Sequence, residues 1–61
     1  SDVYKRQVAK RLAVTEVTIR RWLKRGILNG LETPAGWRLE ESDVQAFLNK
    51  HRNVPQPEAQ P

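Results

Sequence analysis

The sequence predicts a small, mainly α-helical domain, in which two short helices, a two-stranded β-hairpin and a third helix follow in order. Three observations predict this fold class. Apolar residues recur at three- and four-residue spacing in three separate stretches, which is typical of amphipathic helices. Between the second and third stretches the spacing alternates around a proline–glycine turn, which is typical of a hairpin. A chain of 61 residues has room for one compact core.

The first helix is predicted over residues 4–12. Val8 and Leu12 are four positions apart with Ala9 beside them, while lysine and arginine occupy the other faces. The residues before this helix are expected either to extend it or to hang free.

The second helix is predicted over residues 15–25. Thr15 is a good N-cap, because its hydroxyl can accept a hydrogen bond from an unpaired amide of the first turn. Glu16 in that turn suits the helix dipole, and two cations suit the last turn. Gly26 follows as a residue able to adopt positive φ. The apolar stripe consists of Ile19, Trp22 and Leu23.

Two short strands are predicted over residues 28–33 and 36–39, with the proline–alanine–glycine segment between them as the turn. Asn29-Gly30 is a rival turn signal that would give a tighter hairpin with a different register. The first choice leaves Trp37 and Leu39 on one face of the returning strand.

The third helix is predicted over residues 41–51, with acidic residues in its first turn and basic residues in its last. Glu40 is the expected N-cap, with Ser42 as a later alternative. Its inner face consists of Val44, Phe47 and Leu48, and His51 is expected to lie exposed at its end. We therefore expect a domain of residues 3–52, followed by a disordered, proline-rich tail of residues 53–61.

One core is expected to collect the apolar side chains of all these elements. It consists of Val8, Ala9, Leu12, Val14, Ile19, Trp22, Leu23, Leu28, Leu31, Trp37, Leu39, Val44, Phe47 and Leu48.

The composition excludes several classes of protein. The chain has no cysteine and one histidine, so we expect no disulfide, no metal site and no cofactor. No apolar run approaches the roughly 20 residues that span a bilayer, and no signal-peptide pattern is present, so we expect a cytoplasmic protein. Glu41 and Asp43 are close in sequence, but no nucleophile or basic cleft accompanies them, so we expect no enzyme.

The charge is divided unevenly along the chain. Residues 1–26 hold eight basic and two acidic residues, a charge of +6, whereas residues 27–61 hold three basic and five acidic residues, a charge of −2. Such a split indicates a surface that faces a polyanion. On charge alone, nucleic acid and an anionic membrane both qualify. The membrane is the weaker candidate, because the apolar stripe of the second helix is needed inside the fold.

The segment from Val8 to Gly26 resembles the helix-turn-helix of excisionase-type and MerR-type winged-helix proteins. The resemblance covers about residues 6–49. The motif residues are Ala9, Leu12, Val14-Thr15, Thr18-Ile19-Arg20, Trp22 and Gly26, then Trp37-Arg38-Leu39 in the wing and Glu41-Ser42-Asp43-Val44 at the third helix. Together they imply a winged helix-turn-helix that binds double-stranded DNA.

The sequence departs from this pattern in two places. Ala13 stands in the turn where the family usually has a glycine in the left-handed conformation, which costs on the order of 1 kcal/mol. The chain also lacks the long dimerisation helix and effector domain of full MerR-type regulators, which favours the excisionase-like alternative.

The resemblance implies that the second helix enters the major groove. Its helical period turns one face away from the core. Base contacts are therefore expected from Glu16, Val17, Thr18, Arg20, Arg21 and Lys24. Phosphate contacts are expected from Arg6, Lys10, Arg11, Thr15, Arg25 and Arg38. For Lys5 and Arg11, a phosphate contact and a simple solvated charge are equally supported. For Glu16, a base contact and an interaction with the helix dipole alone are equally supported.

The expected function is sequence-specific binding of double-stranded DNA, as an excisionase-like recombination factor or a small transcription regulator of bacterial or phage origin. A second copy, a recombinase or a polymerase would be the protein partner on DNA. An engineered DNA binder on this scaffold is left open. The alternatives are a basic protein-interaction adaptor, an RNA-binding module and a nonspecific nucleic-acid binder; RNA binding usually brings exposed aromatic residues, whereas both tryptophans here are expected in the core.

Overall fold

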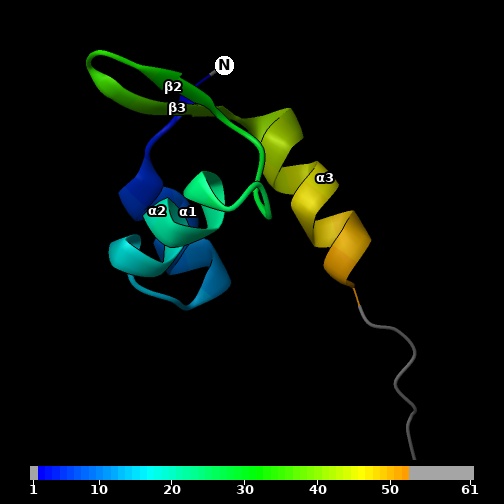
Figure 1. Ribbon diagram of the computed structural model, residues 1–61. Helices are drawn as coiled ribbons and strands as arrows, with labels where there is room; N and C mark the ends of the chain where they lie inside the picture. Colours follow the sequence, from blue (N-terminus) through cyan, green and yellow to red (C-terminus); the bar gives the residue numbers. More distant parts are fainter. Residues whose placement is uncertain (1, 53–61) are drawn as a thin grey trace, which may run out of the picture.

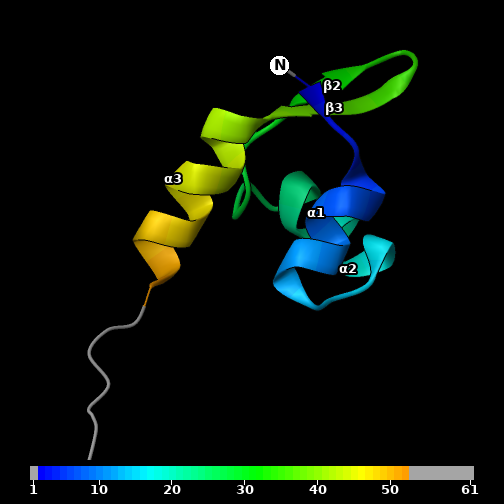
Figure 2. The same cartoon turned by 180° about the vertical axis from the view of Figure 1, so that it is seen from behind.

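The computed structural model describes residues 2–52. The predicted tail of residues 53–61 lies outside them. In chain order the elements are β1 (Asp2–Val3), α1 (Lys5–Leu12), α2 (Glu16–Lys24), β2 (Leu31–Thr33), β3 (Gly36–Glu40) and α3 (Glu41–His51). The predicted fold class, a small and mainly helical winged helix-turn-helix, is confirmed. Figures 1 and 2 show the sheet over one end of the helices, with α1 and α2 on one side and α3 on the other.

The turn between α1 and α2 has the geometry that the sequence predicts. Ala13 lies in the left-handed region, with φ 58° and ψ 43°. Its N–H donates to the Lys10 carbonyl at 3.2 Å, so the last turn of α1 is capped. Thr15 is the N-cap of α2, because its hydroxyl accepts from the Thr18 N–H at 3.2 Å. At the other end of α2, Gly26 has φ 75°.

The sheet has one more strand than the sequence predicts. Its order is β1-β3-β2, with both pairs antiparallel. Asp2 and Val3 neither extend α1 nor hang free, because they pair with Glu40 and Leu39, and Val3 packs against the core. The packing of Val3 accounts for this strand, since its partly buried side chain lies opposite the fully buried Leu39.

The hairpin turns at Pro34–Ala35, so the predicted turn is confirmed and the rival turn at Asn29-Gly30 is wrong. The Thr33 hydroxyl holds the turn, because it donates to the Gly36 carbonyl at 2.7 Å and accepts from the Ala35 N–H at 3.2 Å.

Strand β2 begins at Leu31, three residues later than predicted. The reason lies at the end of α2, where the Leu28 N–H donates to the Trp22 carbonyl at 3.3 Å and the Leu28 side chain is buried. Gly30 then passes close to α2: a Cβ there would lie 2.8 Å from Cδ2 of Leu23. These residues are tied to the helix and cannot join the strand.

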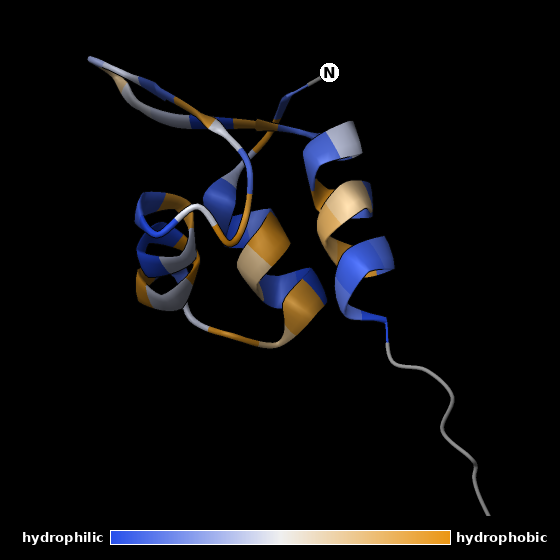
Figure 3. Ribbon diagram, turned by 45° about the vertical axis from the view of Figure 1, so that its right-hand side comes forward, coloured by the Kyte–Doolittle hydropathy of each residue, from blue (hydrophilic) through white to orange (hydrophobic). Residues whose placement is uncertain are grey.

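The core contains thirteen of the fourteen side chains predicted for it. The fully buried residues are Val8, Ala9, Ile19, Leu23, Leu28, Leu39 and Val44. The prediction for Leu31 is wrong, since that side chain is 65% exposed. Leu31 pairs with Arg38, and the burial of neighbouring Leu39 turns Arg38, and Leu31 beside it, to the outer face of the sheet. Figure 3 shows hydrophobic segments on the helix sides that face the middle of the fold.

Helix α3 begins where the sequence predicts, with Glu40 as the N-cap. The Glu40 N–H donates to Oδ2 of Asp43 at 3.0 Å. The helix packs on α2 through stacked rings of Trp22 and Phe47, whose centroids are 5.2 Å apart. His51 is exposed as predicted, but its ring also lies 4.4 Å from that of Phe47.

Candidate nucleic-acid interface

The outward side of α2 is free of the rest of the fold. Ile19 and Leu23 on the inner side are almost fully buried, whereas Val17 is 50% exposed. Arg20 and Arg21 are exposed too, and neither forms an ion pair within residues 2–52. The exposed residues of this side are Glu16, Val17, Arg20, Arg21 and Lys24, with Thr18 half-buried. An apolar valine among unpaired cations is the arrangement that the sequence predicts for a base-reading face.

The hydroxyls at the start of α2 have partners of their own. The Oγ1 atoms of Thr15 and Thr18 are 3.1 Å apart, and the Thr15 hydroxyl also accepts from the Thr18 N–H. The role of Thr15 as an N-cap is therefore clear in the structure. Its predicted contact with phosphate stays a prediction.

Two of the predicted phosphate contacts on α1 lie next to the start of α2. Arg6 and Lys10 are exposed and, together with Glu16, line a hollow of about 360 Å³ between the two helices. Arg25 is exposed at the other end of α2, where it is the C-cap. These three cations border the outward side of α2 at both of its ends.

Arg11 is turned toward α3. Its guanidinium donates to both carboxylate oxygens of Glu41, at 2.8 and 2.9 Å, and Gln45 donates to the same carboxylate at 2.9 Å. The hydrogen bonds from Arg11 and then Gln45 lower the pKa of Glu41 to about 2, and the pair raises the pKa of Arg11. The charge of Arg11 is thus already compensated, and the residue links α1 to α3.

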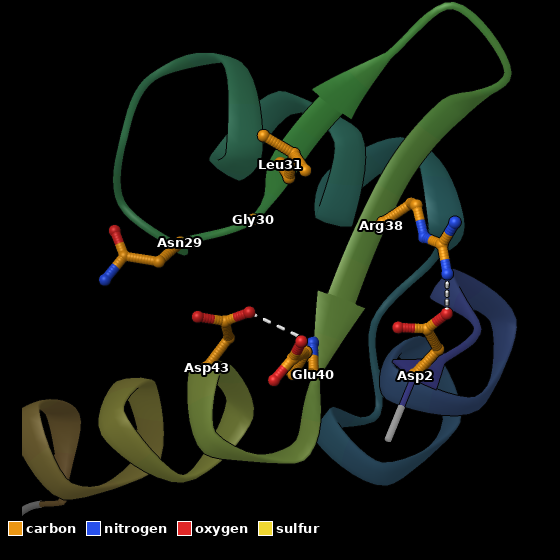
Figure 4. A pocket seen from close by; sticks show the side chains of 7 residues that line it. All are labelled: Asp2, Asn29, Gly30, Leu31, Arg38, Glu40 and Asp43. Carbon is orange, nitrogen blue, oxygen red and sulfur yellow. Dashed lines mark hydrogen bonds and ion pairs between the residues drawn. The ribbon is translucent and has the colours of Figure 1, made fainter.

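Arg38 lies on the outer face of the sheet, where it forms an ion pair with Asp2. Figure 4 shows this face, which is hollowed by about 600 Å³ and carries the exposed Leu31 together with the carboxylates of Glu40 and Asp43. Arg38 also lines a hollow with Lys5 of α1, but it does not line the hollow that Arg6 and Lys10 share beside α2. Acidic residues outnumber basic ones on this side of the wing.

One exposed residue next to α2 is absent from the predicted interface. Tyr4 is 64% exposed, and the Arg6 guanidinium lies over its ring at 5.0 Å from the centroid. Tyr4 lies outside the apolar stripe of α1 because it is the N-cap of that helix. Periodicity alone therefore gave no signal for it.

Within residues 2–52, no group of three or more histidine, cysteine, aspartate or glutamate side chains is placed to hold a metal ion. No helix in that range is long and apolar enough to cross a membrane.

The helix-turn-helix, the wing and the exposed basic side of α2 define a DNA-binding domain. The family model described as a helix-turn-helix domain matches residues 6–52, and the chain belongs to that family. No curated protein and no solved structure matches the chain. The family match supports DNA as the partner and leaves the excisionase-type or MerR-type subtype unassigned.

Proposed function

We propose that this chain binds double-stranded DNA with α2 in the major groove and selects a short base sequence there. The observation that carries the proposal is the outward side of α2, where Arg20, Arg21 and Lys24 are exposed and unpaired within residues 2–52. A capped helix with one basic side has the width and charge to enter the groove.

Each residue type on this side matches a different base edge. The forked donors of Arg20 and Arg21 fit the O6 and N7 atoms of guanine. The exposed methyl groups of Val17 fit the methyl group of thymine, and the carboxylate of Glu16 can accept from the amino group of cytosine. Thr18 and Lys24 complete the predicted set at the sides of the helix.

The flanking residues hold the phosphates. Arg6, Lys10 and Arg25 border α2 and form no ion pair within residues 2–52, and Thr15 caps the start of the helix. Arg11 and Arg38 join them only by leaving Glu41 and Asp2. Phosphate contacts set affinity and orientation, whereas base contacts set the sequence that is preferred.

The role that fits such a module is that of an excisionase-like recombination factor or a small transcription regulator inside a bacterial or phage-infected cell. It requires no catalytic group, because the domain acts by marking DNA for others. A domain of this size covers few base pairs, so high specificity requires a second copy, a recombinase or a polymerase bound beside it.

Selection of duplexes from a random pool tests the proposal directly. A defined motif is expected, and Arg20→Ala or Arg21→Ala should cost about 1–3 kcal/mol at one base position and relax the preference there. Lys50→Ala, which removes an exposed cation from α3, is the matched control and should change nothing. Equal binding to duplex DNA, single-stranded DNA and an acidic polypeptide would overturn the proposal.

A further inference from the structure

Tyr4 combines a fixed backbone with an exposed ring. Its N–H donates to Oε1 of Gln7 at 3.0 Å, and its carbonyl accepts from the N–H groups of Gln7 and Val8 at 2.9 and 3.1 Å. On its other side Val3 is held in the sheet by Leu39. The residue itself remains 64% exposed, so a large amphipathic side chain is presented to solvent from a backbone that three hydrogen bonds tie to α1.

Tyr4 lines two hollows, and a third adjoins them through shared residues, so that the three form one trough. The first, of about 400 Å³, is lined by Tyr4, Lys5 and the hairpin turn at Ala35. The second, of about 210 Å³, shares Tyr4 and Lys5 with the first and adds Arg6 and Glu16. The third, of about 360 Å³, shares Arg6 and Glu16 with the second and continues between α1 and α2. The trough therefore runs from the tip of the wing, past Tyr4, to the first turn of α2. In Figures 1 and 2 the hairpin reaches out on the side of α1 and α2, as this path requires.

The trough is basic, and three of the four cations that line it are unpaired within residues 2–52. Lys5, Arg6 and Lys10 line it, and none of the three forms an ion pair within residues 2–52. Arg6 instead rests on the ring of Tyr4, which orients the guanidinium without compensating its charge. Arg38 lines the first hollow together with Asp2, with which it is paired. Arg11, outside the trough, is paired with Glu41. Glu16 at the α2 end is the one carboxylate among the residues that line the second and third hollows.

We infer that this trough is a seat for one sugar–phosphate strand, and that Tyr4 is the residue that positions it. The tyrosine ring packs on deoxyribose, its hydroxyl donates to a phosphate oxygen, and its face holds Arg6 toward the next phosphate. Lys5 contacts the same strand on the wing side, and Glu16 keeps the phosphates on the lysine side of the trough. The inference rests on the proposed function and extends it to Tyr4 and Lys5, which precede the residues of the family match.

The first test compares Lys5→Ala with Lys50→Ala, which remove the same charge from the trough and from α3. Binding of a duplex is measured as a function of salt concentration. The log–log slope should become shallower by about 0.9 for Lys5→Ala, for one lost phosphate contact, and stay unchanged for Lys50→Ala. Equal slopes for both variants would overturn the proposal that the trough binds a sugar–phosphate strand.

The second test concerns Tyr4. Tyr4→Phe keeps the ring under Arg6 and loses only the hydroxyl, so binding should fall roughly threefold to tenfold for every duplex sequence alike. Tyr4→Ala should weaken binding further, and it should abolish the ring-current shift that we expect for the Arg6 side chain in NMR spectra of the wild type. After Tyr4→Ala, the loss caused by Arg6→Ala should be smaller than in the wild type, since Arg6 is then no longer positioned. Unchanged thermal unfolding of Tyr4→Phe shows that the effect is on binding.

The outcomes separate the two proposals. If Arg20→Ala weakens binding and the Tyr4 and Lys5 variants do not, the trough is overturned and the α2 proposal stands. If none of the variants changes binding, both are overturned.

Discussion

Ala13 is the only non-glycine residue with positive φ within residues 2–52. Its conformation completes the turn between α1 and α2, and an L-residue there is strained by the approach of Cβ to the following carbonyl. The sequence could predict this residue, and likewise Thr15 and Gly26, because caps and tight turns depend on neighbours within a few positions.

Ala13→Gly should therefore stabilise the fold. Removing Cβ relieves the strain, and the expected gain is about 1 kcal/mol in the free energy of unfolding. Urea denaturation measures it, with Ala35→Gly in the hairpin turn as a control where no positive φ is present. A loss of stability in Ala13→Gly would contradict the strain.

The ion pairs at the residue scale were beyond prediction from sequence. Arg11 and Glu41 are 30 positions apart, and Arg38 and Asp2 are 36 apart. No local pattern relates such residues, so the sequence assigned both arginines to phosphate. The structure shows that each has a carboxylate partner, which makes it a poorer candidate than Arg6 or Lys10.

Strands β2 and β3 show what the sequence resolves at the scale of an element. The turn at Pro34–Ala35 could be predicted from its composition, but the inward or outward direction of Leu31 depends on its partner across the hairpin. Strand β1 could not be predicted at all, because two residues are too few to show the alternation of apolar and polar side chains that indicates a strand. Its existence depends on the vacant edge of β3.

The register of the hairpin can be tested by truncating one leucine on each face. Leu39→Ala removes a fully buried side chain and should cost about 2–5 kcal/mol in unfolding free energy. Leu31→Ala removes an exposed one and should stay within about 0.5 kcal/mol of the wild type. Equal costs in urea denaturation would mean that the register is wrong.

The pair of Arg11 and Glu41 joins α1 to α3 and makes that junction sensitive to acid. The pKa of Glu41 is about 2 in the folded chain against an ordinary value of 4.5. Between these two pH values, the unfolded chain therefore binds more protons than the folded chain. The stabilisation is therefore fully present above about pH 5 and is lost as the pH falls toward 2.

Glu41→Gln should flatten this part of the pH profile. The variant is expected to be less stable than the wild type near neutral pH, with the difference shrinking as the pH falls toward about 2. Urea denaturation across this range measures it. Arg11→Gln should give the same flattening, and the double variant should add little. A constant difference between wild type and Glu41→Gln at all pH values would contradict the pair.

At the scale of the whole molecule, basic and acidic residues lie on different surfaces. Most of the cations that form no ion pair within residues 2–52 lie on α1 and α2, whereas the outer face of the sheet is acidic around Leu31. The uneven charge of the sequence predicted a basic surface that faces a polyanion, and the structure shows which surfaces carry the basic and the acidic residues. The sequence could not separate them fully, because Arg38 belongs to the basic residues by type and to the acidic face by position.

Lys10→Ala and Arg38→Ala should therefore differ in their effect on DNA binding. Both should weaken all sequences alike, as phosphate contacts do, but Lys10→Ala should weaken them more and flatten the salt dependence by about 0.9 in log–log slope. Arg38 must first leave Asp2, so its loss costs less. Salt titrations of a fixed duplex measure both, and a larger effect from Arg38→Ala would show that the wing face meets DNA.

Strand β1 has a consequence for the order of folding. Among the strand pairs of residues 2–52, the pairing of Asp2 with Glu40 joins the positions farthest apart in sequence. Closing so long a loop costs chain entropy that two residues barely repay, so β1 should dock last and detach first. Its amides should exchange with deuterium sooner than those of α2. Since Tyr4 follows β1 directly, a DNA strand bound in the trough would slow that exchange. The N-terminal amides would then report whether DNA occupies the trough, without any label.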